Sequence, residues 1–212
     1  MSYILPRWLS PSLVAAPLCA AMVLLSCGKK SSDDTPSATS PDSVKLTGTW
    51  KSDCKSGSFL TESFFRKKVT FQLDGGFKRQ IEVFDNDQCN SSRASQTLTG
   101  TYTVAGDEPK EPDAKRLNLT SKATYVTPQT DSDTANFNQS KYCGIADWKT
   151  GTEREVTGAD CASGFKEGQV IFDVYRIQDN HIYFGATGIW LNGRTDVQRP
   201  EKVDLTDPHA KQ

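Results

Sequence analysis

The chain has 212 residues, with 25 lysines and arginines against 26 aspartates and glutamates, and a formal net charge of −1. This near-balance lacks the basic excess of a nucleic-acid-binding protein, so we expect no nucleic-acid partner. Hydrophobic residues make up 36% of the chain. Once the N-terminal segments are set aside, roughly 160 residues remain, which suits one domain with a sizeable core.

The N-terminus has the layout of a secretory signal peptide over residues 1–26. A single positive charge, Arg7, precedes an apolar run from Leu13 to Leu25, and the run ends at a small residue, Ser26. A transmembrane helix needs roughly 20 apolar residues, which this run does not reach. We therefore expect the segment to direct export and to be removed.

The stretch Leu24-Leu25-Ser26-Cys27 resembles a bacterial lipobox. The resemblance implies that Cys27 becomes the mature N-terminus and carries diacylglycerol on its thiol and an acyl chain on its amine, which gives stable anchoring. Gly28-Lys29-Lys30 follows without an aspartate, a pattern that in this class is typical of sorting to the outer membrane. We expect a lipid-anchored protein of the bacterial cell envelope that faces the periplasm. The alternative is an ordinary secretory signal that contains a cysteine.

The residues after Cys27 predict a flexible tether over 27–43. SSDDTPSATSPDS (31–43) contains no large apolar side chain, so it cannot bury surface that would offset its chain entropy. The expected domains are therefore the signal peptide (1–26), the lipidated tether (27–43), a folded domain (44–206) and a C-terminal tail (207–212).

The folded part is predicted to be all-β. Val69, Phe71 and Leu73 alternate with polar residues, which indicates a strand with one buried face. Asp74-Gly75-Gly76 then suits a tight hairpin. Further strands are expected at Leu46–Lys51, Phe77–Phe84, Ser95–Gly106, Arg116–Val126, Gln169–Ile177 and His181–Thr187, with a weaker one near Lys202–Leu205.

About eight strands joined mainly by short turns predict an antiparallel up-and-down meander that closes into a barrel, because closure removes exposed edges. Such a barrel is either filled by side chains or holds one small ligand. The expected inward-facing residues are Val69, Phe71, Leu73, Ile81, Val83, Val170, Phe172 and Tyr183. The mostly polar segment Thr127–Lys166 is expected to be a long loop.

Four cysteines remain beside Cys27 and Cys19 of the leader: Cys54, Cys89, Cys143 and Cys161. An even number in an exported chain predicts two disulfides. Pairing in sequence order is favoured, because Cys54 follows the first strand and Cys89 follows the third, whose ends share a rim. Cys143 and Cys161 would then staple the long polar segment to itself. Crossed pairings stay open.

Leu46-x-Gly48-x-Trp50 on the first strand of an exported meander resembles the lipocalin (calycin) superfamily. The resemblance implies a lipocalin-like barrel in which Gly48 allows a close strand crossing and Trp50 plugs the closed end. It also implies an arginine above the tryptophan, with Arg199 as the candidate and Arg194 as the less favoured one. The alternative is a β-sandwich in which Trp50 is an ordinary core residue.

The stretch Tyr142–Cys161 contains Tyr142, Ile145 and Trp148 in a polar setting. These side chains would form a lid or a partner-binding surface, or they would simply pin the segment to the barrel wall, which we favour.

No esterase, phosphate-loop or zinc-protease motif occurs in the sequence. Acidic clusters lack the calcium-loop pattern, and Cys161 with His181 as a nucleophilic pair is disfavoured by oxidising export. We expect no catalytic residue, no metal and no cofactor. The expected function is a monomeric, non-catalytic envelope protein that binds or carries a small apolar molecule. The alternatives are an interaction module that binds another envelope component and, less favoured, an enzyme with a diffuse active site.

Overall fold

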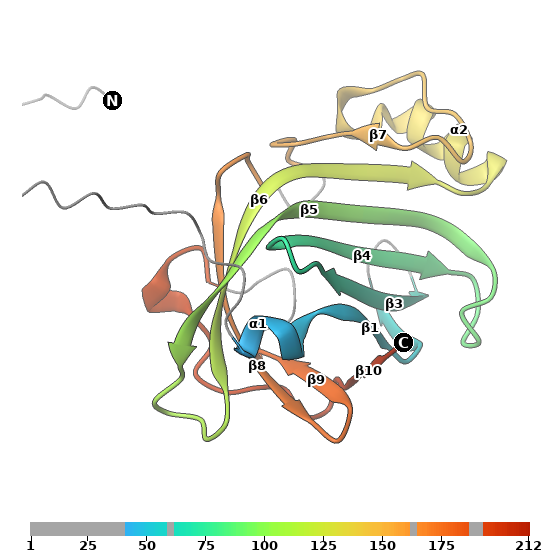
Figure 1. The fold of residues 1–212 in the computed structure, drawn as a ribbon. Helices are drawn as coiled ribbons and strands as arrows, with labels where there is room; N and C mark the ends of the chain where they lie inside the picture. Colours follow the sequence, from blue (N-terminus) through green and yellow to red (C-terminus); the bar gives the residue numbers. More distant parts are fainter. Residues whose placement is uncertain (1–40, 59–61, 162–164, 187–192) are drawn as a thin grey trace, which may run out of the picture. The chain divides into compact units, whose positions relative to one another are not determined.

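The structure, a computed structural model, describes residues 41–58, 62–161, 165–186 and 193–212 (Figure 1). The predicted signal peptide, Cys27 and the tether up to residue 40 lie outside the described residues. The elements are α1 (Pro41–Leu46), β1 (Gly48–Ser52), β2 (Lys55–Ser58), β3 (Glu62–Phe71), β4 (Gly76–Phe84), β5 (Ser92–Asp107), β6 (Lys115–Pro128), α2 (Asp131–Ser140), η1 (Tyr142–Gly144), β7 (Arg154–Glu155), β8 (Val170–Gln178), β9 (His181–Phe184), η2 (Asp196–Gln198) and β10 (His209–Lys211).

Eight strands form a closed antiparallel barrel, which confirms the predicted fold class. Their order around the barrel is β1-β10-β9-β8-β6-β5-β4-β3, and pairing of β1 with β3 closes the ring. Two further strands extend it, because β2 pairs with β3 and β7 pairs with β6. No helix within the described residues has both the length and the apolar character that crossing a membrane requires.

Glycines shape the barrel wall at two places. Gly75 has a φ of +84° in the β3–β4 turn, where Asp74 Oδ1 accepts a hydrogen bond of 2.9 Å from the Gly76 N–H. At Gly100 a Cβ would lie 1.9 Å from the carbonyl oxygen of Thr120. The β5–β6 register shifts between Thr99 and Gly100, and this irregularity lets the two longest strands curve around the barrel.

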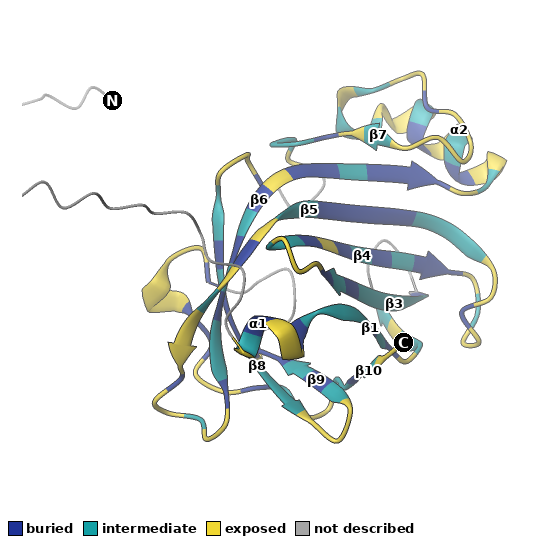
Figure 2. Cartoon of the chain, viewed as in Figure 1, coloured by how far each residue is buried: buried dark blue, intermediate teal, exposed yellow. Residues whose placement is uncertain are grey.

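One end of the barrel is filled by a large apolar cluster. Trp50 is only 1% exposed, and its Nε1–H donates to the carbonyl oxygen of Leu46 in α1 at 2.8 Å. We call this end, which carries the β3–β4, β5–β6 and β8–β9 turns, the closed end. The buried stretches of the strands are dark blue in Figure 2. The cluster comprises Leu46, Trp50, Val69, Phe71, Phe77, Leu98, Tyr102, Leu117, Leu119, Phe165, Ile171, Tyr175, Ile182 and Phe184.

The prediction of which strand residues face the barrel interior is wrong for four of the eight residues. Val69, Phe71, Ile81 and Val83 are buried as expected, but Leu73 lies beyond the end of β3 and is 57% exposed. On β8 and β9 the buried, inward residues are Ile171, Asp173, Tyr175, Ile182 and Phe184, so Val170, Phe172 and Tyr183 face outward. The outer face of these strands is also covered, by a small cluster of Ala114, Val174 and Val203 with Tyr183 against it. Apolar residues on both faces removed the alternation that would have identified the inner one.

Two expected boundaries are also corrected. The predicted tail, 207–212, contains β10, which lies between β1 and β9 and completes the barrel. Near Lys202–Leu205 the structure has only the single bridge Gly185↔Val203. At the other end, α1 begins at Pro41, inside the expected tether. Strands and helices this short carry too few residues for a recognisable periodicity.

We expect Trp50→Ala to lower the free energy of unfolding by about 3–5 kcal/mol, because it leaves a large cavity in the closed end. Urea denaturation would measure the loss. Val197, which is 98% exposed, supplies the control, since Val197→Ala should change stability by less than about 0.5 kcal/mol. A loss at Trp50 no larger than that of the control would contradict its role as the barrel plug.

Candidate functional site

The interior away from the closed end is polar, and it contains a buried ion pair. Arg79 on β4 is 1% exposed and Asp173 on β8 is 0% exposed, with 3.9 Å between Nη2 and Oδ2. In the strand order β5 and β6 separate β4 from β8, so the pair reaches across the barrel interior. Burial lowers the pKa of Arg79 to about 10, although the charge of Asp173 opposes the shift. Asp173 Oδ1 also accepts from the Gly185 N–H at 3.1 Å.

His209 of β10 lies near this pair and is 1% exposed. Its Nδ1 is 3.0 Å from the carbonyl oxygen of Asp207, so Nδ1 carries the proton of the neutral ring. Burial lowers the pKa of the imidazole to about 4, and the cations Lys67 and Arg79 add to this effect. Nε2 has no hydrogen-bond partner within the part of the chain that the structure describes. The ring packs edge-on against Phe184, with 5.3 Å between centroids.

Asp207 holds two lysines at the same side of the barrel. Its Oδ1 is 2.7 Å from Lys55 Nζ and its Oδ2 is 2.6 Å from Lys67 Nζ. Burial alone would raise the pKa of Asp207, but the hydrogen bonds from Lys55 and Lys67 lower it below its ordinary value. The polar interior therefore contains Arg79, Lys55 and Lys67 against Asp173 and Asp207, with a neutral His209 beside them. It can bind a hydrogen-bond donor at Nε2 of His209, or it can serve as an internal tie between strands.

Arg199 does not cover Trp50, which corrects the expected pairing. Its guanidinium lies 5.1 Å from the ring centroid of Phe172 on the outer face of β8 and donates to the carbonyl oxygen of Asp173 at 2.6 Å. The cation above Trp50 is Lys211, with Nζ 5.1 Å from the ring centroid. Pairing of β10 with β1 places Lys211 directly opposite Trp50, so the unforeseen last strand supplies the cation.

Gly48 has a backbone conformation that favours glycine. Its φ is +126°, and a Cβ there would lie 3.0 Å from Cε of Lys211. A side chain at this position would be strained and would press on the lysine that covers Trp50. The requirement for glycine at position 48 therefore comes mainly from this positive φ, because the Lys211 side chain can shift.

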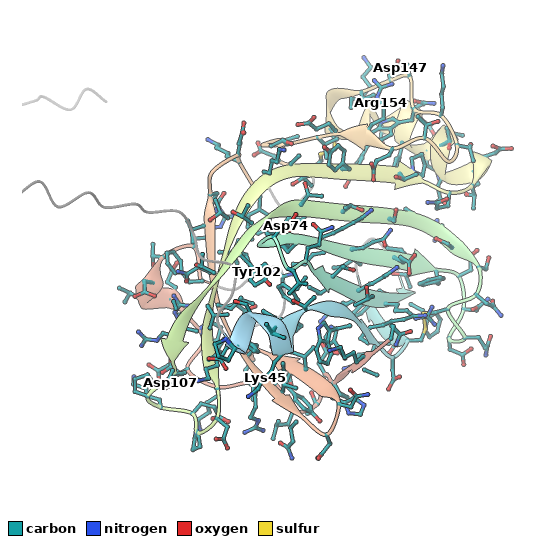
Figure 3. The ribbon with its side chains drawn as sticks, in the orientation of Figure 1. Lys45, Asp74, Tyr102, Asp107, Asp147 and Arg154 are labelled. Atoms are coloured by element: carbon teal, nitrogen blue, oxygen red, sulfur yellow. A yellow bond between two sulfur atoms is a disulfide. The ribbon has the colours of Figure 1, made fainter. Side chains whose placement is uncertain are left out.

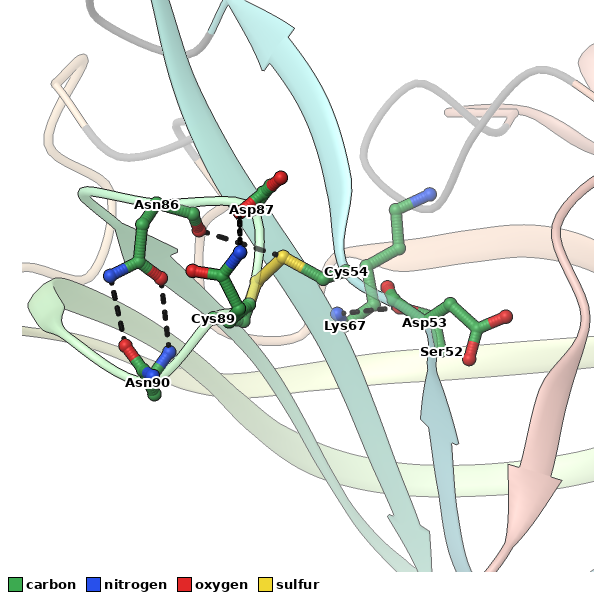
Figure 4. Close-up of a disulfide and its surroundings, with 9 residues drawn as sticks. Ser52, Asp53, Cys54, Lys67, Asn86, Asp87, Cys89 and Asn90 are labelled. Atoms are coloured by element: carbon green, nitrogen blue, oxygen red, sulfur yellow. Dashed lines mark hydrogen bonds between the residues drawn. A yellow bond between two sulfur atoms is a disulfide. The ribbon is translucent and has the colours of Figure 1, made fainter.

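Both disulfides form in sequence order, which confirms the favoured pairing. Cys54–Cys89 joins the junction of β1 and β2 to the β4–β5 loop, and Cys143–Cys161 closes the polar segment. Figure 4 shows the first of these beside Ser52, whose Oγ accepts from the Lys67 N–H at 3.0 Å. The loop that carries Cys89 is held by a bond of 2.8 Å from Asn86 Nδ2 to Asn90 Oδ1. All four described cysteines are thus occupied in structural bonds.

The long polar segment folds into α2, η1 and β7 and packs on the barrel wall. Trp148 is 3% exposed and belongs to a cluster with Val126 and Phe137, against which Tyr142 and Ile145 pack. The Tyr142 and Phe137 rings stack at 4.5 Å. Tyr142, Ile145 and Trp148 therefore pack the segment against Val126, on the same face of the sheet as Ile81. The polar ion pair of this segment, Asp147 with Arg154, lies on its outer side (Figure 3).

The expected loop missed α2 because this helix has little apolar sequence. It is held by its N-cap, Thr130, whose side chain accepts from the Asp133 N–H at 3.0 Å. Sequence analysis also missed Arg79, Asp173 and His209 as interior residues. Asp173, a lone carboxylate between Phe172 and Val174 in an apolar strand, was the one signal that could have revealed a polar interior.

No protein-family model matches the chain, and no curated protein matches it in sequence. Within the described residues, no group of three or more His, Cys, Asp or Glu side chains is placed to hold a metal ion.

The depressed pKa of His209 predicts a pH-dependent stability. The unfolded imidazole titrates near 6.5 and the folded one at about 4, so the unfolded chain binds more protons between these values. Above pH 6.5 the imidazole is neutral in both states and has no effect on the free energy of unfolding. As the pH drops to 4, this free energy should fall by up to about 3 kcal/mol. Denaturation at several pH values would measure this slope, which His209→Gln should flatten. His181→Gln, on the neighbouring strand, should leave the slope in place; an unchanged slope in His209→Gln would contradict the assignment.

Proposed function

We propose that this protein is a lipid-anchored, non-catalytic module of the bacterial cell envelope, with a lipocalin-like barrel that works through its outer surface as a monomer. The observation that carries this proposal is the filled interior. Fourteen buried hydrophobic residues form one cluster in the barrel, and eight-stranded barrels are just wide enough for side chains to fill. An interior occupied by its own side chains leaves the surface to make contacts with other envelope components.

The space beneath the stapled segment agrees with this view. The apolar cavity between Ile81, Val83, Val126 and the α2–η1 region, near Phe137 and Tyr142, has a volume of only about 20 Å³. Pockets for small molecules measure roughly 300–1,000 Å³. An apolar cargo, which the sequence led us to expect, has no support at this position.

A second candidate, the carriage of a small molecule, is favoured by the polar interior. Arg79, Lys67 and Nε2 of His209, which has no hydrogen-bond partner among the described residues, would suit a ligand with polar or anionic groups better than an apolar one. Such a ligand would have to enter where Lys55, 30% exposed along its side chain, borders Asp207.

The envelope location rests on the leader and the disulfides together. Signal-peptide layout, lipobox and polar tether follow one another in the right order. Two disulfides suit an oxidising compartment outside the cytoplasm. The lipocalin-like assignment is supported by Gly48 and Trp50 on the first strand of a closed barrel with a cation above the tryptophan.

The anchor is tested by Cys27→Ser in the full chain in a bacterial host. We expect the variant to lose globomycin-sensitive processing and to leave the membrane fraction, because no thiol is available for diacylglycerol. Cys19→Ser, inside the apolar run, is the matched control and should be processed and retained like the wild type. A Cys27→Ser protein that stays membrane-bound would refute the anchor.

The filled barrel is tested by native mass spectrometry of the mature chain carrying Cys27→Ser, after incubation with a broad lipid extract. We expect the mass of the polypeptide with two disulfides and no adduct. A stoichiometric apolar adduct would overturn the filled-barrel proposal in favour of a carrier. Phe77→Ala, which opens space in the apolar cluster, would show whether the method detects such an adduct once room exists.

A further inference from the structure

A cationic groove of about 610 Å³ lies on the outer wall of the barrel, where β1, β3 and β4 run side by side. It takes no part in the interior described above. The groove is lined by Thr49, Lys51, Arg66, Lys68, Glu82, Phe84 and Gln212.

Strand alternation explains why the cations gather there. In the run Arg66-Lys67-Lys68, Lys67 turns to Asp207 inside the barrel, so its two neighbours turn outward. Lys51 of β1 is paired directly with Lys68 of β3. Like charges that lie directly opposite on neighbouring strands destabilise a sheet. Glu82 of β4 is paired directly with Arg66 and offsets part of this charge, but the other cross-strand partners of Lys51 and Lys68 are Ala210 and Gln80, which are uncharged.

The groove cations have no acidic partner within salt-bridge distance in the described part of the chain. None of Lys51, Arg66 and Lys68 forms one of its ion pairs, and Glu82 is the single carboxylate side chain among the lining residues. All three are only half-exposed, and the Arg66 guanidinium is held 5.3 Å from the ring centroid of Phe84. The groove is thus a positively charged concavity on a chain whose net charge is −1.

A second groove shows the contrast. It lies at the closed end, where Lys45 and Asp107 both line it (Figure 3), and two of its three cations are in ion pairs. Lys115 bonds Asp42 and Arg176 bonds Glu111. Among the residues that the structure describes, the outer-wall groove has three lining cations outside any salt bridge, whereas the second groove has one, Lys45.

We propose that the outer-wall groove binds the phosphate-bearing headgroups of a membrane surface. A guanidinium and two ammonium groups around one concavity suit phosphate oxygens, which accept charge-assisted hydrogen bonds. A bound phosphate would also offset the repulsion between Lys51 and Lys68.

The choice of a membrane as the source rests on the proposed lipid anchor. Thirteen residues separate Cys27 from Pro41, where α1 begins. A flexible chain of this length has a root-mean-square span of roughly 20 Å. An anchored domain would therefore meet headgroups at a high effective concentration, and even a weak groove would be occupied.

The test uses the mature chain with Cys27→Ser, so that the lipid anchor does not contribute to membrane binding. Binding is measured by sedimentation with vesicles of phosphatidylcholine alone and with added phosphatidylglycerol, and in solution with glycerol 3-phosphate. We expect salt-sensitive binding only to the anionic vesicles. The double variant Lys51→Gln/Lys68→Gln should weaken it roughly thirtyfold, given the contribution of a lysine near an anionic surface.

The matched control is Lys122→Gln/Lys149→Gln, which removes the same charge from two exposed lysines outside the groove. It should bind like the parent protein. Thermal unfolding gives a second measure: the groove variant should melt no lower than its parent. No binding to anionic vesicles, or an equal loss in both double variants, would overturn the proposal. Groove-dependent binding of glycerol 3-phosphate without vesicle binding would overturn the membrane as the source.

Discussion

β1 is hydrogen-bonded along both of its edges, to β3 on one side and to β10 on the other. This double pairing turns an open sheet into a barrel, and three other features depend on it. It buries Trp50 under α1, it brings Lys211 over the indole, and it places the Lys211 side chain 3.0 Å from where a Cβ of residue 48 would lie. It also places His209 in the interior, opposite Ser52. The burial of Trp50 and the position of His209 in the polar interior therefore both depend on the pairing of β1 with β10.

Apolar and charged side chains occupy different parts of the barrel. The closed end is apolar, and the remaining interior contains the Arg79–Asp173 pair and the Asp207 clamp. A buried ion pair is weak evidence for stability, because desolvation offsets much of its attraction. Its value here is orientation, since it ties β4 to β8 across the interior. The outer wall, by contrast, leaves Lys51 and Lys68 opposed, and both lysines line the groove proposed to bind phosphate.

Two kinds of feature could be predicted from the sequence: strands with alternating apolar and polar residues, and disulfides between cysteines at strand ends that a meander brings together. Val69 and Phe71 alternate with exposed polar residues, so β3 and the hairpin after it were predictable. The disulfides were predictable because a meander brings Cys54 and Cys89 to one rim. The inward orientation predicted for Phe172 is wrong, because both faces of β8 are covered and its sequence shows no clear alternation. β10 has three residues, too few for a pattern, and α2 depends on a cap and a disulfide rather than on an apolar stripe. Arg79 could not be placed inside, because a charged residue in a strand is normally read as outward-facing.

The same double pairing of β1 has a consequence for how the chain folds. The two disulfides join residues 35 and 18 positions apart, whereas barrel closure joins Trp50 to Lys211. Contacts between such distant residues carry a larger loop-closure entropy and form slowly. Hairpins and disulfides should therefore form first, as local units, and closure should be the late, rate-limiting event. Until then β1 and β10 present unpaired edges, so the open sheet is the species most prone to aggregate during folding.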